Sequence, residues 1–361
     1  MVRTRIAPSP TGYPHIGTIY QALFNFAFAK KHQGKFLVRI EDTDRNRLVE
    51  GSEEVIFAVL DWFNLVEDES VRKDGEYGPY RQSERLAIYH NYAEELINKG
   101  HAYFAYYKRE EAGKKEDYVA NPRVQIITQT DEAPPTSIKE MVERKNWVIR
   151  MRAPKDKSVS FQDEIRGIIT FEADQITDQV LIKSDGFPTY HLAVVVDDHL
   201  MQITHVVRGE EWISSTPKHV LLYDYFGWEK PLFYHTPDLR NPDKSKLSKR
   251  HGHTNVNWYK EEGFLHEAVL NYLALLGWSH PEEKEIFSLS EFIKLFDLKD
   301  IKPVGPVFDL VKLKWVNQQY LQNKTDDELQ QLIINFYPKA KELNKEILTK
   351  LMPIVKTRME I

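Results

Sequence analysis

The stretch Ala7-Pro-Ser-Pro-Thr-Gly-Tyr-Pro-His-Ile-Gly-Thr18 decides the fold. Residues 2–7 are predicted to form a short β-strand that Pro8 and Pro10 end, and the turn leads into apolar residues at helical spacing that Thr18 is predicted to cap. At such a turn in a doubly wound fold, backbone N–H groups and the positive end of the helix point at a phosphate. The turn matches neither the dinucleotide-binding nor the P-loop glycine pattern.

Two residues of this turn are candidates for chemistry. His15 is predicted to donate a hydrogen bond at the start of the helix, and Gly17 leaves room for a base or a phosphate to approach closely. A proline-rich turn with a surface histidine explains the same residues, and the motif alone does not separate the two interpretations.

Outward from this turn, strands and helices alternate. The pattern predicts a strand over residues 36–40 and helices over 52–64 and 83–99, an order typical of a parallel, doubly wound α/β sheet. Between about residues 102 and 185 the helical pattern weakens and β-rich runs appear, over 147–152, 168–171 and 180–182. This segment is predicted to be an α+β insertion.

The sheet is then predicted to resume and to be followed by helices. The second half comprises a helix over 190–200, a strand over 203–208, a helix over 216–226 and a strand over 232–235. Beyond residue 241 the predicted helices are 265–276, 289–296, 310–321 and one that begins near Asp326.

Composition limits the class of protein. The 361 residues include 49 Lys and Arg against 54 Asp and Glu, a net charge of −5, which excludes a wholly basic nucleic-acid sleeve but not a local basic groove. There is no cysteine, which excludes disulfides, thiolate nucleophiles and cysteine-ligated metals. No run approaches the ~18 apolar residues of a membrane span. These features predict a multidomain protein of the cytoplasm with no membrane partner.

A second candidate motif is Asp243-Lys-Ser-Lys-Leu-Ser-Lys-Arg250. Its lysines, Lys246 and Lys249 among them, are suited to neutralise charge that grows on a polyphosphate in a transition state. A solvated basic loop, or contact with a nucleic-acid backbone, accounts for the same residues.

Together, the His-Ile-Gly turn and the Lys-Leu-Ser-Lys-Arg segment resemble the two signature motifs of class I aminoacyl-tRNA synthetases. Five further sequence motifs make the resemblance more specific, to the bacterial glutamyl-tRNA synthetases, and the resemblance covers essentially the whole chain. They are Arg5-Ile-Ala-Pro-Ser-Pro-Thr-Gly12, Val38-Arg-Ile-Glu-Asp-Thr-Asp44, Gly78-Pro-Tyr-Arg-Gln-Ser-Glu-Arg85, Lys183-Ser-Asp-Gly-Phe-Pro-Thr-Tyr-His-Leu-Ala193 and Val207-Arg-Gly-Glu-Glu-Trp212.

The resemblance implies a Rossmann-like doubly wound sheet split by an α+β insertion and followed by a mostly helical stem-contact module. The implied domains are 1–85 and 190–240 for the two halves of the catalytic domain, 86–189 for the inserted acceptor-stem-binding domain, 241–322 for the stem-contact domain and 323–361 for the start of a helical anticodon-binding domain.

The resemblance also implies two sets of site residues. For glutamate they are Arg5, Ala7, Ser9, Glu41, Tyr190 and Arg208. For ATP they are His15, Gly17, Glu211, Leu239, Lys246 and Lys249, with His15, Lys246 and Lys249 as the catalytic group and Mg²⁺ arriving with ATP. Arginine forks match carboxylates bidentately. Alternatively, Arg5 and Glu41 form a structural salt bridge across neighbouring strands, and Leu239 and Trp212 are ordinary core residues.

The implied reaction is activation of L-glutamate by ATP to glutamyl-adenylate with release of pyrophosphate, then transfer to the 3′-terminal adenosine of tRNA(Glu) with release of AMP. A monomer is implied. The alternatives are a paralogue that glutamylates the queuosine base of a tRNA, a glutaminyl-tRNA synthetase, and a catalytically silent synthetase-like tRNA-binding protein.

Three departures qualify the resemblance. Val194 stands where relatives often carry an asparagine that contacts the amino acid, yet glutamate is expected to remain the substrate because Arg5, Glu41 and Arg208 are present. Residues 102–107 lack the cysteines of relatives with zinc, so no structural zinc is expected. The last stretch, interrupted by Pro353, has no stop signal before Ile361, which predicts a fragment that lacks most of the anticodon-binding domain.

Overall fold

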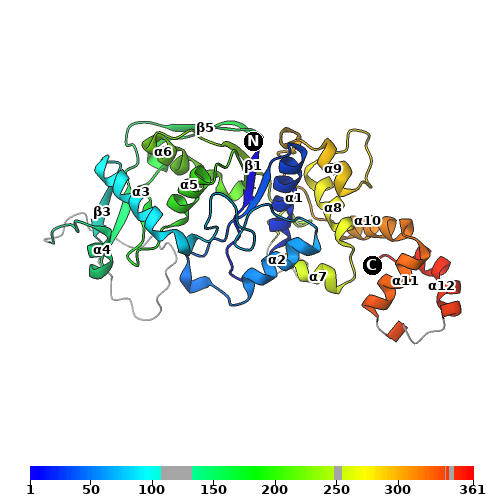
Figure 1. Cartoon of the computed structure of the whole chain (residues 1–361). Coiled ribbons are helices and arrows are strands. Elements are labelled where there is room, and N and C mark those ends of the chain that lie inside the picture. Colours follow the sequence, from blue (N-terminus) through cyan, green and yellow to red (C-terminus); the bar gives the residue numbers. More distant parts are fainter. Residues whose placement is uncertain (107–131, 248–253, 338, 341–344) are drawn as a thin grey trace. The chain divides into compact units, whose positions relative to one another are not determined.

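The computed structural model describes residues 1–106, 132–247, 254–337, 339–340 and 345–361 (Figure 1). The chain divides into two compact units, each assembled from several segments. The first unit comprises Met1–Gly12, Gln33–Glu53 and Glu67–His235, and the second comprises Tyr13–His32, Glu54–Val66 and Thr236–Ile361. Each unit therefore combines stretches that are far apart in the sequence.

The first unit combines strands and helices. Its strands are β1 (Arg3–Ile6), β2 (Lys35–Val38), β3 (Ala102–Tyr106), β4 (Trp147–Met151), β5 (Val159–Asp163), β6 (Gly167–Phe171), β7 (Val180–Ile182), β8 (His205–Gly209) and β9 (Leu232–Thr236). Its helices are α3 (Leu86–Asn98), α4 (Ile138–Arg144), α5 (Tyr190–Leu200) and α6 (Thr216–Phe226). Helix α5 contacts both α3 and α6 (Figure 1).

A parallel sheet forms the base of this unit. Strands β1 and β2 pair in parallel, with Arg5 opposite Leu37, and all four residues of β1 are buried. The backbone N–H of Thr204, just before β8, donates to the carbonyl of Arg3 at 3.0 Å, which joins the second half of the sheet to β1. Every residue of β1 and the last three of β2 are buried, as expected for parallel strands that are covered on both faces. The predicted α/β fold class is confirmed.

The central segment contributes two antiparallel features. Strands β3, β4 and β7 form a sheet in that order, with antiparallel pairs throughout. Strands β5 and β6 form a hairpin whose first strand pairs with β9, with Asp163 opposite Phe233. Strand β5 was not among the predicted strands, although its alternating burial pattern is typical of one.

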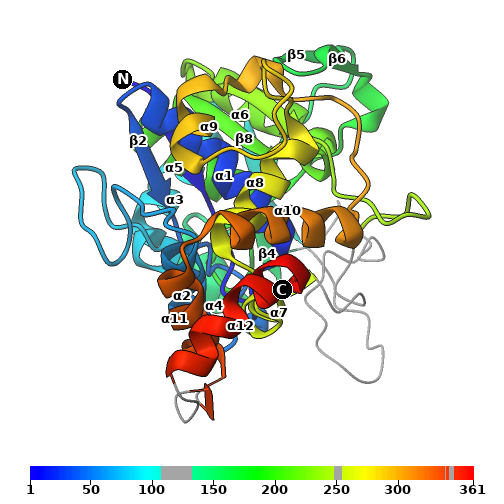
Figure 2. The ribbon, with the colours of Figure 1, turned by 90° about the vertical axis from the view of Figure 1, so that its right-hand side faces the viewer.

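The second unit is mostly helical (Figure 2). Its helices are α1 (Ile16–Lys31), α2 (Ser52–Trp62), α7 (Val256–Glu261), α8 (His266–Gly277), α9 (Leu289–Leu295), α10 (Leu310–Asn323), α11 (Asp326–Phe336) and α12 (Lys345–Arg358), which contains Pro353. Helix α1 packs on α8 and α9, and its Phe24 ring stacks on Phe296 at 5.2 Å between centroids. Gly277 permits this close packing, because a Cβ there would stand 2.4 Å from the Tyr20 hydroxyl.

Most predicted elements are confirmed to within a few residues, and the ranges of α5 and α6 agree at both ends. The predicted cap of α1 is wrong, because the helix begins at Ile16 and its N-cap is His15 rather than Thr18. An imidazole nitrogen takes the role that serine or threonine hydroxyls usually fill. The division into domains given above stays a prediction. Among the described residues no helix is long and apolar enough to cross a membrane.

Gly34 sits where the turn into β2 passes the start of β1, and it generates a stability prediction. A Cβ at this position would stand 2.2 Å from the carbonyl oxygen of Val2, which accepts the N–H of Lys35. We expect Gly34→Ala to lower the free energy of unfolding by ~2–3 kcal/mol, measured by denaturant titration. The backbone at Val2 or at residue 34 would have to move to make room for the new Cβ. The matched control is Gln33→Gly, which relieves a φ of 52° and is expected to leave stability unchanged or raised. Equal stability of the two variants would contradict this account.

Candidate active site

Arg5 leaves the buried strand β1 toward a carboxylate of helix α5. Its Nε and Nη2 donate to the two oxygens of Asp198 at 3.1 and 3.0 Å, a bidentate pair in which both side chains are buried. Burial lowers the pKa of Arg5, but Asp198 outweighs that effect, so the pKa is raised overall. The partner of Arg5 is thus Asp198, and the alternative of a bridge between Arg5 and Glu41 is wrong.

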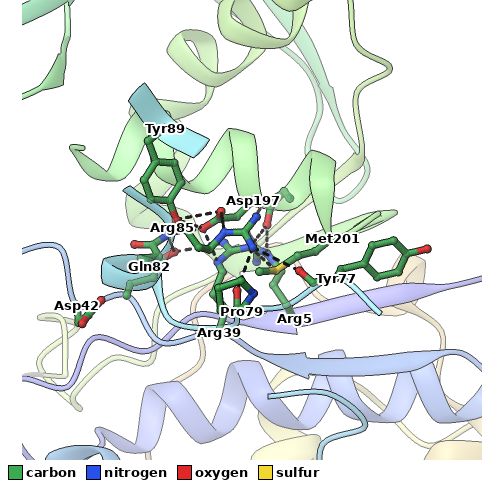
Figure 3. Close-up of polar contacts among 12 residues, drawn as sticks. Arg5, Arg39, Asp42, Tyr77, Pro79, Gln82, Arg85, Tyr89, Asp197 and Met201 are labelled. Carbon is green, nitrogen blue, oxygen red and sulfur yellow. Dashed lines mark hydrogen bonds and ion pairs between the residues drawn. The ribbon is translucent and has the colours of Figure 1, made fainter. Parts of the chain in front are cut away.

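Arg39, at the end of β2, lies at the centre of this charged cluster (Figure 3). Its Nη1 donates to Asp198 at 2.8 Å, its Nη2 to Glu41 at 3.3 Å, and its Nε lies 3.5 Å from Asp197. The side chain is fully buried, and its three acidic neighbours raise its pKa against the effect of burial. It is therefore a charged hub that links two strands to α5.

Asp197 receives the remaining donors of the cluster (Figure 3). Arg85 Nε donates to it at 2.8 Å, Gln82 Nε2 at 2.9 Å, and the Tyr89 hydroxyl lies 2.9 and 3.0 Å from its two oxygens. A buried carboxylate is tolerable when its oxygens are satisfied in this way. Arg39, Asp197 and Asp198 were missed by sequence reasoning, although two adjacent acids after an apolar run, Leu192–Val196, were a signal.

Glu41 is an acid of this cluster whose pKa lies near neutrality. Burial raises its pKa to about 7, although Arg39 and Arg5 act in the opposite direction. Its backbone N–H donates to the carbonyl of Pro8, which holds it beside the loop after β1. A largely buried carboxylate with a pKa near neutrality is a candidate for contact with a substrate cation.

Arg208, near the end of β8, has a different environment. Its guanidinium donates to Tyr190 Oη at 2.9 Å, His219 Nδ1 at 3.2 Å, Thr216 Oγ1 at 2.8 Å and His235 Nε2 at 3.1 Å. These four acceptors are neutral, so these contacts orient the guanidinium without neutralising it. The ring of Tyr190 packs on Trp212 at 4.1 Å between centroids, and burial raises the pKa of its hydroxyl.

The histidines around Arg208 stay uncharged. Burial lowers the pKa of His235 to about 4, and burial with nearby Lys218 and Arg208 lowers that of His191 to about 3. Burial also lowers the pKa of His219, whose Nε2 lies 3.1 Å from His191 Nδ1. A neutral ring can accept from Arg208, whereas a protonated ring cannot.

The second unit holds the turn that opens α1. The Nδ1 of His15 accepts the backbone N–H of Gly17 at 3.0 Å, so the neutral ring carries its proton on Nε2. His15 was expected to donate a hydrogen bond at the start of the helix. Its Nδ1 accepts one instead, so only Nε2 can act as a donor. His15 also forms an antiparallel β-bridge with Asn255, the N-cap of α7, which brings the chain beyond the basic motif to the start of α1.

Part of the basic motif is described. Lys246 forms a β-bridge with Arg240, its half-exposed side chain pairs with Asp238 at 2.9 Å, and the N–H of Leu247 donates to the carbonyl of buried Leu239. Lys249 lies outside the described residues. The described part of the motif is thus a tight backbone turn that presents a lysine.

The remaining predicted residues divide between the units. In the first unit, Ala7 and exposed Ser9 follow β1, and exposed Glu211 lies in the 3₁₀ turn after β8. Gly17 and Leu239 belong to the second unit with His15 and Lys246. Within the described ranges no cluster of three or more His, Asp or Glu side chains could hold a metal ion.

These features suit recognition rather than covalent catalysis. The first unit combines an oriented arginine, a tyrosine hydroxyl and a titratable glutamate. Arg208 donates to the Tyr190 hydroxyl at 2.9 Å, and the charges of Glu41 and Arg5 act on the pKa of that hydroxyl in opposite directions. Such a set can bind a small molecule that carries carboxylates and an ammonium group.

Comparison with known proteins gives a consistent picture. Residues 1–315 match the family described as tRNA synthetases class I (E and Q), catalytic domain. The chain is 53% identical over 325 residues to the glutamate–tRNA ligase of Thermus thermophilus and 49% identical over 366 residues to that of Marinomonas sp.. Those matches cover 89% and 99% of this chain, and 68% and 73% of the relatives.

Solved structures agree with the sequence matches. The glutamate–tRNA ligase of Elizabethkingia meningosepticum, solved in complex with its amino acid, superposes with a TM-score of 0.86 at 38% identity, and the enzyme of Elizabethkingia anophelis with a TM-score of 0.88 at 38% identity. These matches cover all of this chain and 78% and 79% of the others. The Rossmann-like core predicted from the sequence is confirmed.

The raised pKa of Glu41 predicts a stabilising substitution. Between its ordinary pKa of 4.5 and about 7 the folded state keeps a proton that the unfolded state loses, so Glu41 lowers the free energy of unfolding as pH rises through this window. We expect Glu41→Gln to be more stable than the parent at pH 8 by ~2–3 kcal/mol, and the gain to vanish toward pH 4.5.

Denaturant titrations at pH 5 and pH 8 check this expectation. The matched control is Glu69→Gln, because Arg3 lowers the pKa of buried Glu69 and its loss should destabilise the protein at pH 8. Destabilisation of the Glu41 variant at pH 8 would contradict the assignment.

Proposed function

The chain belongs to the class I aminoacyl-tRNA synthetases of the glutamate and glutamine group, and on that premise we propose that it is a glutamate–tRNA ligase. It activates L-glutamate with ATP to glutamyl-adenylate and pyrophosphate, and transfers glutamate to the 3′-terminal adenosine of tRNA(Glu) with release of AMP. One observation carries the proposal. Arg208 donates to the Tyr190 hydroxyl, and the charges of Glu41 and Arg5, in the same unit, act on that hydroxyl.

Each part of glutamate has a partner in this proposal. Arg208, oriented by neutral acceptors and paired with the Tyr190 hydroxyl, binds a carboxylate. Glu41 faces the ammonium group, whose positive charge lowers the pKa of Glu41 again on binding. Arg5 adds positive potential while Asp198 fixes its direction, and Ala7 and Ser9 line the pocket.

The proposal assigns ATP to His15, Gly17, Glu211, Leu239, Lys246 and Lys249. His15 Nε2, with its proton fixed by the cap contact at Nδ1, donates to the α-phosphate or to the departing pyrophosphate. Lys246 and Lys249 neutralise charge as the glutamate carboxylate attacks in line. Mg²⁺ would come with ATP, bound mainly through phosphates and water.

Three further statements belong to the proposal. The inserted domain, residues 86–189, binds the acceptor end of tRNA, and the stem-contact domain, residues 241–322, binds the inner stem. Residues 323–361 begin the anticodon-binding domain. The protein acts as a monomer in the cytoplasm.

ATP–pyrophosphate exchange tests the function directly. With tRNA(Glu) present, we expect exchange with glutamate and at least tenfold less with glutamine or aspartate, because a site built for a carboxylate leaves polar groups unpaired with an amide or a shorter chain. The same assay without tRNA measures how far activation depends on it. Preference for glutamine, or no exchange under either condition, would overturn the proposal.

A pair of substitutions at His15 separates its two roles. His15→Asn keeps an oxygen that caps α1 but has no group at the position of Nε2, whereas His15→Ala loses both. We expect both variants to lose at least 100-fold in exchange rate, and only the alanine variant to lose ~1 kcal/mol of stability. An asparagine variant with parental activity would show that capping is the whole function of His15.

A further inference from the structure

His235 on β9 connects Arg208 to a buried carboxylate that the proposed reaction does not use. Its Nε2 lies 3.1 Å from Arg208 Nε, and its Nδ1 lies 2.6 Å from Oδ2 of Asp163 on β5. Both His235 and Asp163 have 0% exposed side chains. The three groups form a continuous chain from the interior to the guanidinium.

The hydrogen-bond directions in this chain are fixed by chemistry. Arginine can only donate, so His235 Nε2 must be a bare acceptor, and its proton must then sit on Nδ1. Nδ1 in turn requires an acceptor, which the Asp163 carboxylate provides. Asp163 therefore selects the tautomer that can hold Arg208.

The same carboxylate also fixes the backbone on both sides of the chain. Its Oδ2 accepts the N–H of His235 at 3.0 Å, and its Oδ1 accepts the N–H groups of Ile165 and Arg166 at 3.1 and 2.9 Å. The turn of the β5–β6 hairpin and strand β9 thus share one anchor. An amide at this position cannot satisfy all these donors, because one of its two heavy atoms is itself a donor.

We propose that Asp163 and His235 are positioning residues that hold Arg208 in the orientation required to bind the substrate carboxylate. This inference rests on the proposed function, in which Arg208 binds glutamate. Neither residue touches the substrate. Their effect reaches the reaction through the direction of the Arg208 guanidinium.

Substitutions can test the contacts of the two ring nitrogens of His235 one at a time. In His235→Gln the side-chain oxygen reaches the position of Nε2 and still accepts from Arg208, while the contact with Asp163 is lost. In His235→Asn the amide reaches only the position of Nδ1, so Asp163 keeps a partner and Arg208 loses one. Asp163→Asn keeps the shape but removes the acceptor that fixes the tautomer.

Steady-state exchange with full-length chain and tRNA measures KM for glutamate and for ATP in each variant. We expect KM for glutamate to rise about tenfold or more in Asp163→Asn and His235→Asn, and less than about threefold in His235→Gln, with KM for ATP unchanged. The matched control is Asp178→Asn, which removes a half-buried carboxylate that accepts from Ala153 N–H and Tyr103 in the β3–β4–β7 region. It should cost stability and leave KM for glutamate unchanged.

Each outcome is decisive. Thermal unfolding shows whether a variant is folded at the assay temperature. Equal KM values in the two His235 variants, or parental KM in Asp163→Asn, would overturn the positioning role while exchange by the parent still supports the proposed function. Absence of glutamate-dependent exchange in the parent would instead overturn the proposed function.

Discussion

The burial of two adjacent carboxylates, Asp197 and Asp198, is the constraint on which the first unit depends. Isolated, each would cost several kcal/mol to remove from water, and their mutual repulsion would add to that. Arg5, Arg39 and Arg85 offset this cost from three different segments. Because none of these charges is tolerable in the interior without the others, β1, β2, the start of α3 and α5 are held in one relative arrangement.

The two arginines that are proposed to bind glutamate, Arg5 and Arg208, have different environments. Asp198 fixes the direction of the Arg5 guanidinium, and its negative charge cancels part of the positive potential of Arg5. Arg208 donates to a phenol, a hydroxyl and two neutral imidazoles, and these contacts fix its direction. In the proposed glutamate site, the acceptors around Arg208 hold the plane of its guanidinium in one direction, which suits bidentate contact with a carboxylate.

The sequence predicted the α/β class and most elements, because these depend on local periodicity and on short sequence motifs. It did not predict the partners. Arg5, for which a salt bridge with Glu41 was the alternative interpretation, pairs instead with Asp198, which is 193 residues away in the chain. Strand β5 was missed because five alternating residues between polar turns give a weak signal, and with it Asp163 was missed. Long-range pairing of buried charges is a property of the fold, and no spacing rule in one sequence encodes it.

The cap of α1 explains why histidine and glycine stand two residues apart in the opening turn. A side chain that caps a helix accepts from the second or third N–H, and in this chain the acceptor is His15 Nδ1 and the donor is Gly17. A Cβ on residue 17 would stand 3.1 Å from that nitrogen and push the ring away, so the second position favours glycine. The cap leaves the proton of the neutral ring on Nε2 and limits the rotation of the ring. The spacing is therefore a condition for a histidine that presents one N–H in a fixed direction at the positive end of a helix, which is the arrangement that the proposed contact with a phosphate needs.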